Sequence, residues 1–168
     1  MTTNDLQQAS KTISWADPRP TAALGQQLSG IDFLTKMLAG EVPAPPISSH
    51  FGMSLVSVEV GDAVFEALPD DSHYNPIGVV HGGLALTLLD SAAGCAVHST
   101  LAVGQAYTSL ETKVNFLRAI TSDTGPVRAH GWVSKPGKRA AFAEADLRTI
   151  DGTLLATAQS TCLVYPLN

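Results

Sequence analysis

The chain has 168 residues, of which 45% are hydrophobic and 15% charged, and its formal net charge is −5 at pH 7. This is the composition of a globular protein with one ordinary core, and the chain is too short for two comfortable domains. The acidic balance argues against a general binder of nucleic acid or of anionic membranes. Cys95 and Cys162 each lie in an apolar run, so both are expected to be small buried hydrophobes in a reduced protein.

Targeting and metal signals are not visible in the sequence. The N-terminus has no basic region followed by an apolar stretch, so a cytoplasmic protein is expected. Residues 82–101 have the length of a membrane span, but Asp90 lies at their centre, and we expect a helix buried in protein instead. No CxxC pair, HExxH motif or clustered His and Cys spacing occurs, so no metal or other cofactor is expected.

The first part of the chain, residues 1–45, is expected to be a tail with one short helix. About the first 25 residues are polar and predict a loosely held segment. A helix is predicted from Ser29 to about Ala39, because Ser29 and Asp32 resemble a capping box. Residues 43–46 are rich in proline and predict a stiff extended connector.

The remaining residues, 46–168, are expected to form one α+β domain. Strands are predicted at Met53–Val60 and Ala63–Leu68, followed by a loop to residue 80 and a helix over residues 82–101. Turn residues separate four further strands, predicted at Tyr107–Leu117, Val127–Ser134, Arg139–Thr149 and Thr153–Tyr165.

Alternation predicts which side chains share a face of these strands. Val56, Val58 and Val60 are expected on one face of the first strand. Leu110, Val114 and Phe116 are expected on one face of the third strand, opposite Ser109, Glu111, Lys113 and Asn115. The helix is apolar nearly all round and must be covered on most sides. Since the last four strands have turn-length links, the pattern favours a curved antiparallel sheet wrapped around one helix and excludes a doubly wound parallel sheet.

Asp90 is a lone carboxylate in the middle of this apolar helix, and its neighbours predict strong burial. A buried carboxylate without partners costs several kcal/mol or takes up a proton. One interpretation is a structural acid, hydrogen-bonded to the backbone or to nearby Ser and Thr side chains. The other is a catalytic acid, because perturbed buried acids concentrate at functional sites.

The helix opens with His81-Gly82-Gly83, and glycine at this point lets a ligand approach the backbone closely. The first helical turn leaves N–H groups unpaired at the positive end of the helix dipole, and such donors stabilise the oxyanion formed from a thioester carbonyl. The alternative is a glycine turn that serves only geometry. Asp90 lies about 13 Å further along the helix, so two chains with antiparallel helices would bring these groups together better than one chain.

Residues 75–92, from Asn75 through His81-Gly82-Gly83 to Asp90-Ser-Ala, resemble the signature of hotdog-fold thioesterases of the phenylacetic-acid-degradation (PaaI-like) type. Residues 113–118 and 137–148 agree with the family in order and spacing, and the resemblance covers about residues 50–165. It implies the α+β hotdog fold, with subunits that pair as a homodimer or as a dimer of dimers. Residues 1–45 match nothing in the family's core motif and are a candidate cover for the substrate channel.

The resemblance also implies roles for the matching residues. The backbone N–H of Gly82, helped by the Asn75 side chain, would bind and polarise the thioester carbonyl. His81 would position the thioester, and Asp90 of the other subunit would act as general base or as nucleophile. A hydroxyl on the following strand would assist the base, and the register favours Ser109.

Further residues are expected to contact the substrate. The resemblance places the turn after residue 136 near the phosphates of CoA, and this turn carries positive charge in an otherwise acidic protein. The substrate-binding candidates are Gly83, Thr108 as the alternative to Ser109, Gly137, Lys138 and Arg139.

The predicted function is hydrolysis of an acyl-CoA thioester to a free acid and CoA, with an aryl or a medium-chain acyl group. Two alternatives remain open at this level: a hydratase or dehydratase of acyl thioesters on the same fold, and a non-catalytic acyl-CoA-binding protein. Hydration generally needs a His–Asp pair that acts on the β-carbon, whereas Asp90 together with Asn75 favours hydrolysis.

Overall fold

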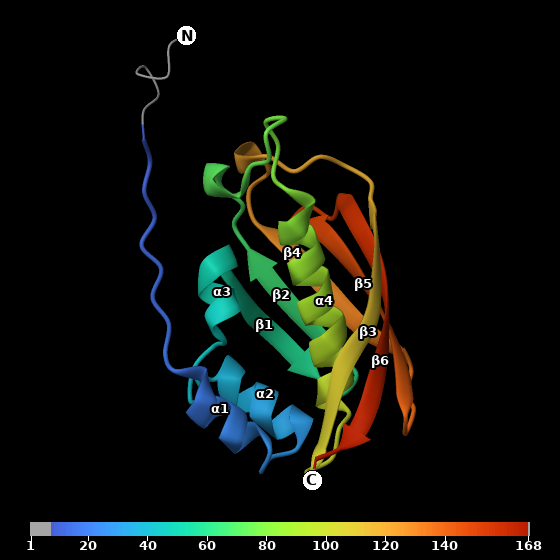
Figure 1. Ribbon diagram of the computed structural model, residues 1–168. Coiled ribbons are helices and arrows are strands. Elements are labelled where there is room, and N and C mark those ends of the chain that lie inside the picture. Colours follow the sequence, from blue (N-terminus) through green and yellow to red (C-terminus); the bar gives the residue numbers. More distant parts are fainter. Residues whose placement is uncertain (1–7, 168) are drawn as a thin grey trace.

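The computed structural model describes residues 8–167, which form one antiparallel sheet with a long helix against it (Figure 1). The long helix, α4, runs from Gly82 to Ser99. The strand order in the six-stranded sheet is β1-β2-β4-β5-β6-β3, and this arrangement confirms the predicted α+β fold. The strands are β1 (Met53–Glu59), β2 (Asp62–Ala67), β3 (Gln105–Phe116), β4 (Val127–Lys135), β5 (Ala140–Thr149) and β6 (Leu154–Pro166).

The core lies between α4 and the concave face of the sheet. Leu88, Leu89 and Val97 of α4 are fully buried against alternate residues of the strands. Small residues bring helix and sheet close together at Gly131 of β4. A Cβ atom added at Gly131 would lie 2.3 Å from the backbone carbon of Ala92 on α4. The predicted wrapping of a sheet around one helix is therefore confirmed, and glycine at this crossing makes it possible.

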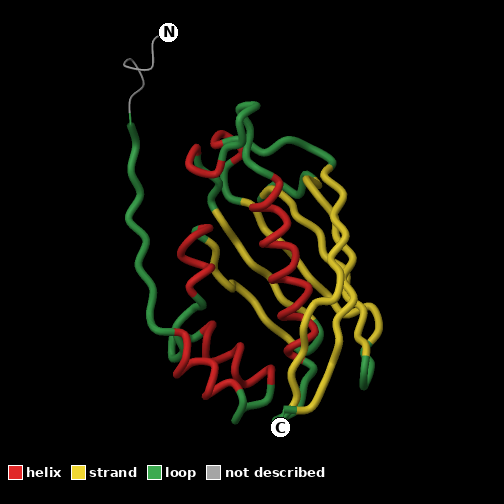
Figure 2. Tube along the Cα trace, viewed as in Figure 1, coloured by secondary structure: helices red, strands yellow, loops and turns green. Residues whose placement is uncertain are grey.

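Three short helices precede the sheet (Figure 2): α1 (Pro18–Gly25), α2 (Gly30–Leu38) and α3 (Pro46–Phe51). Of these, α2 and α3 pack beside β1, and α1 packs against α2. The prediction of α2 is confirmed, with Ser29 as the N-cap whose side chain accepts from the backbone N–H of Asp32. The structure contains no other helix than these, α4 and two 3-10 turns within residues 8–167, namely η2 (Asp71–His73) and η3 (Ser122–Thr124).

The prediction of a loose tail up to about residue 25 is wrong for its last eight residues, which form α1. Asp17 caps this helix by accepting from the backbone N–H of Arg19, and Pro18 occupies the first turn, where a missing N–H costs nothing. The extended connector also ends earlier than predicted, because Pro46 occupies the first turn of α3, as Pro18 does in α1. Residues 1–7 of the predicted tail lie outside the described part of the chain.

The predicted strand faces are wrong in β1 and β3, because each strand contains a bulge. The pairing of β1 with β2 shifts between Leu55 and Ser57, so Leu55 and Val58 face the core while Val56 is exposed. The pairing of β3 with β6 shifts between Ser109 and Glu111. Leu110 is therefore 62% exposed. A bulge adds one residue to a strand and reverses the alternation beyond it.

The other strand predictions agree with the structure to within about two residues at each end, the precision at which strand ends are assigned. None of the helices within residues 8–167 is long and apolar enough to cross a membrane.

Candidate active site

The entrance of α4 presents a backbone donor. His81 is the N-cap, and its Nδ1 accepts from the N–H of Gly83 at 2.8 Å. The N–H of Gly82 donates no hydrogen bond to any residue between 8 and 167. A Cβ atom at Gly82 would lie 3.0 Å from the ring of Phe116 on β3, so the narrow space beside this N–H suits glycine. The Gly82 N–H is thus available to a ligand, whereas the Gly83 N–H is already occupied.

Asn75 belongs to a tight loop just before this entrance. Its Oδ1 accepts from the backbone N–H of Ile77 at 3.0 Å, and its own backbone N–H donates to the carbonyl of Val79 at 2.8 Å. The loop is closed by the N–H of His81, which donates to the carbonyl of His73 at 2.7 Å, and it is tied to the rest of the fold by the N–H of Val80, which donates to the carbonyl of Ile120 at 2.9 Å. With Oδ1 engaged in the loop, the side-chain NH2 group of Asn75 is the part left to contact a ligand.

Asp90 lies in the middle of α4, and hydroxyl groups of β3 hold its carboxylate. The hydroxyls of Ser109 and Thr112 donate to Oδ1 at 3.1 Å and 2.8 Å. The other oxygen, Oδ2, accepts no hydrogen bond from the described residues. Two donors on one oxygen fix the orientation of the carboxylate and leave the second oxygen able to accept a proton from a ligand or water.

The predicted strong burial of Asp90 is wrong for a single chain, in which the residue is half-buried. The side of α4 that carries Asp90 faces β3, which is an edge strand of the sheet. One helical turn before Asp90, the side chain of Leu86 is 41% exposed. The helix is therefore uncovered along one side near the free edge of β3.

Sequence reasoning missed Thr112. Strict alternation puts Ser109 and Thr112 on opposite faces, but the bulge at Leu110 brings both hydroxyls to the same face. No local signal in the strand marks that bulge. Thr108, the alternative to Ser109, is exposed and is not among the described residues that donate a hydrogen bond to Asp90.

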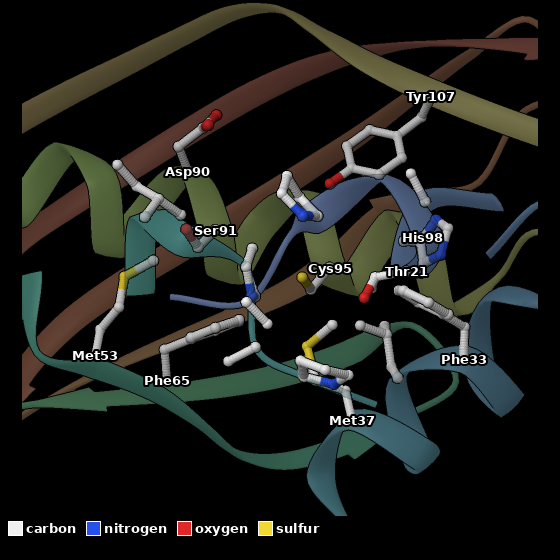
Figure 3. A pocket seen from close by; sticks show the side chains of 18 of the residues that line it. Thr21, Phe33, Met37, Met53, Phe65, Asp90, Ser91, Cys95, His98 and Tyr107 are labelled. Carbon is white, nitrogen blue, oxygen red and sulfur yellow. The ribbon is translucent and has the colours of Figure 1, made fainter. Parts of the chain in front are cut away.

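A cavity of about 420 Å³ begins at Asp90 and extends along α4 to His98 (Figure 3). Cys95 lies between these two residues on the same helix. Burial raises the pKa of the Cys95 thiol to about 12, with a further contribution from the charge of Asp90. The thiol therefore stays protonated at neutral pH, which argues against Cys95 as a nucleophile.

The aromatic end of this cavity contains His98, whose ring packs between Phe33 and Tyr107 at centroid distances of 5.8 Å and 5.7 Å. Burial lowers the pKa of His98 and raises that of Tyr107. The Tyr107 hydroxyl lies against Gly94 of α4, where an added Cβ would come within 2.5 Å of it. Both rings are consequently uncharged at neutral pH.

The basic turn lies at the other end of the sheet from the α4 entrance of the same chain. Ala140, next to Arg139, pairs with Leu163, and Leu163 pairs with Thr108 at the start of β3. Gly82 instead adjoins Phe116 at the end of β3, eight residues away and so about 26 Å along an extended strand.

One chain thus holds three separate groups of the predicted site residues. The first is Asp90 with Ser109, and the second is Asn75 with His81, Gly82 and Gly83, about 13 Å away along α4. The third is the exposed turn of Gly137, Lys138 and Arg139.

The sequence resembles known thioesterases in the region that carries these groups. The profile of the thioesterase superfamily matches residues 77–156. Human acyl-coenzyme A thioesterase 13 is 32% identical over 111 residues, which make up 65% of this chain and 77% of that protein. The chain belongs to the thioesterase superfamily. It is a thioester hydrolase, as the sequence predicted.

Two solved structures agree with the assignment of this chain to the thioesterase superfamily. A phenylacetic acid degradation-related protein from Ralstonia eutropha is 29% identical, with a TM-score of 0.69 over 77% of this chain and 97% of that chain. The PaaI protein of E. coli is 19% identical and shares the fold, with a TM-score of 0.70 over 84% of this chain and 99% of that chain. The predicted PaaI-like hotdog fold is confirmed.

Proposed function

We propose that this thioesterase hydrolyses acyl-CoA thioesters to a free acid and CoA, in a site shared between two subunits. The carboxylate of Asp90 carries the proposal, because two hydroxyls orient it, one oxygen is open, and it borders an apolar cavity. The human relative, named an acyl-coenzyme A thioesterase, supports CoA as the thiol.

The chemistry follows from the groups available. The thioester oxygen accepts from the N–H of Gly82 and the side-chain NH2 of Asn75, which stabilise the negative charge that develops on it. In one route Oδ2 of Asp90 takes a proton from water while the water oxygen attacks the carbonyl carbon. The carbon–sulfur bond then breaks, and the proton passes from Asp90 to the departing sulfur of CoA.

In the other route the Asp90 carboxylate attacks the carbonyl carbon itself and expels CoA. This forms a mixed anhydride between Asp90 and the acyl group, which water hydrolyses to regenerate the carboxylate. Both routes need the carboxylate of Asp90 near the carbonyl carbon and the N–H of Gly82 at the oxygen of the same carbonyl group.

A second subunit would bring these groups together. The edge of β3 carries exposed apolar side chains, among them Leu110 and Phe116, which are 62% and 58% exposed. Pairing two β3 edges about a two-fold axis would cover this edge and run the two α4 helices antiparallel. Asp90 of one subunit would then meet the helix entrance of the other, where His81 would help to position the thioester.

The same two-fold axis would carry the basic turn of one subunit toward the helix entrance of the other. Lys138 and Arg139 are exposed and have no ion-pair partner among residues 8–167, so both charges are free for the phosphates of CoA.

Heterodimers test the shared site. Each half of the site can be removed by one substitution, Asp90→Asn or Gly82→Val. The homodimer of either variant is expected to be inactive. A heterodimer purified through two different tags keeps one intact site, made of Asp90 from one subunit and Gly82 from the other, so it should recover about half of the wild-type activity. An inactive heterodimer would show instead that both residues act within one subunit. Thiol release from octanoyl-CoA is the measurement.

Replacing Thr112 tests the orientation of the carboxylate. A Thr112→Val variant loses the shorter of the two hydrogen bonds to Asp90, and since a bond to a charged group contributes about 1.5–3 kcal/mol, kcat should fall roughly tenfold or more. Thr35→Val, an exposed substitution on α2, provides the matched control and should leave kcat unchanged. Equal kcat for Thr112→Val and wild type would mean that this bond has no part in catalysis.

A further inference from the structure

The cavity that starts at Asp90 follows α4 in one direction. Asp90, Ser91, Cys95 and His98 form one wall, and the nine residues from Asp90 to His98 span about 12 Å of helix. Figure 3 shows these side chains along the helix, with Met37 and the other facing residues on the opposite side. The cavity is therefore an elongated channel that leads away from the carboxylate.

The facing wall is built by the helices that precede the sheet. Thr21 of α1, Phe33 and Met37 of α2, and Ile47 of α3 all line the cavity. These residues lie outside the 77–156 range that the superfamily profile matches. The superfamily profile therefore does not describe this wall.

Helix α1 is incompletely packed at this cavity. None of its eight described residues is buried, although Pro18, Thr21 and Ala22 face the space between α1 and the rest of the fold. A ligand in the channel would fill that space and cover the inner face of α1, which is the arrangement expected of a binding pocket and not of a rigid core.

Apart from Asp90 and Asp17, the residues that line the channel are uncharged, and most of them are apolar. The far end is formed by the rings of Phe33, His98 and Tyr107, and burial keeps the histidine and the tyrosine neutral at neutral pH. The other carboxylate on the cavity wall is Asp17, which is exposed and paired with Arg19 at 2.7 Å. A second carboxylate, on the ligand, would lose its hydration here without meeting an unpaired cation.

We propose, on the basis of the proposed function, that α1, α2 and α3 form the acyl pocket of the subunit that supplies Asp90. The pocket takes an uncharged, unbranched acyl chain of medium length, lying along α4 with its thioester at Asp90. Met37 limits the width of the channel, and Phe33 with His98 closes its far end. Acyl groups that end in a carboxylate are excluded.

A substitution at Met37 tests the wall. Met37→Trp fills the channel, so the ratio of kcat/KM for octanoyl-CoA to that for butyryl-CoA should fall about tenfold or more, since even one methylene in an apolar pocket changes kcat/KM by about tenfold. Leu38→Trp is the matched control, because Leu38 is the next residue of α2 and is 41% exposed outside the cavity. Its ratio should equal that of the wild type.

These measurements distinguish a failure of the proposed acyl pocket from a failure of the proposed function. Failure of the unmodified protein to release thiol from either substrate would overturn the proposed function. Hydrolysis with an unchanged ratio in Met37→Trp would overturn only the pocket. Should Met37→Trp not fold, Phe33→Ala opens the far end, and its kcat/KM for lauroyl-CoA relative to octanoyl-CoA should rise about tenfold. No change in that ratio would equally contradict the assignment.

The wild-type enzyme tests the exclusion of charge without any substitution. Suberyl-CoA matches octanoyl-CoA in chain length but ends in a carboxylate, and its kcat/KM should be roughly a hundredfold lower because the carboxylate would be desolvated in the channel. Equal kcat/KM values for the two substrates would overturn the proposed pocket chemistry.

Discussion

An Asp90→Asn enzyme is expected to release thiol from octanoyl-CoA roughly a hundredfold more slowly than the wild type, or slower still. Asparagine has the same shape and can still accept from the hydroxyls of Ser109 and Thr112, so the fold and the pocket should persist. Its carboxamide cannot take a proton from water and is a very poor nucleophile. The loss should therefore appear in kcat, with a much smaller change in KM.

Asp123→Asn is the matched control for this prediction, since Asp123 is an exposed acid in η3. Its kcat should equal that of the wild type. Unchanged turnover in a folded Asp90→Asn protein would contradict both catalytic routes. Assays of the wild type with an enoyl-CoA distinguish the alternatives, because loss of the enoyl absorbance without thiol release would indicate a hydratase. Binding of acyl-CoA without any turnover would indicate a binding protein.

Gly131→Ala is expected to lower the free energy of unfolding by about 3 kcal/mol, at the upper end of the usual cost of overpacking a core. The added Cβ would lie 2.3 Å from the backbone carbon of Ala92 and 2.5 Å from the backbone nitrogen of Ala93. These are backbone atoms of a buried helix, so neither can move aside as the end of a flexible side chain would. Denaturant unfolding measures the change.

Gly104→Ala separates this clash from the ordinary cost of replacing glycine. Gly104 has φ of 79°, and an added Cβ would meet nothing within 4 Å, so its substitution should cost only the ~1–2 kcal/mol of a left-handed alanine. Gly131 has no such φ, and its cost comes from contact alone. A Gly131→Ala protein as stable as the wild type would mean that sheet and helix are not in such close contact at this crossing.

Local patterns predicted most of the elements correctly. Helix α2 is limited by Ser29 at its start and by Gly40 after its end, and α4 begins with the glycine pair at 82–83. β4, β5 and β6 are joined by short turns whose conformations are set within a few positions of the chain. The predicted turn-length link between β3 and β4 is wrong, because residues 117–126 with η3 connect them and β3 pairs with β6 instead. The carboxylate of Asp90 was recognised as a candidate because burying an unpaired charge in an apolar helix costs free energy, whatever that helix packs against.

Features that depend on the pairing of one strand with another were predicted wrongly. The bulges at Val56 and Leu110 arise from the pairing of β1 with β2 and of β3 with β6, so no residue within a single strand announces them. The missed contact of Thr112 with Asp90 is a direct result. Helix α1 was missed because it is short, contains two prolines and has no buried residue, which leaves no apolar stripe to predict a helix from.

Capping and helical spacing are local properties, so the sequence alone was sufficient to predict a helix with backbone donors at its entrance and a lone acid about 13 Å further on. The tertiary structure was needed to show which hydroxyls hold that acid and that an apolar channel begins beside it. It also decided that the channel's second wall is formed by helices at least 43 residues away along the chain, since Asp90 faces Met37 and Ile47 across the cavity. Strand register and the packing of distant helices depend on contacts between residues far apart in sequence, which no local pattern encodes.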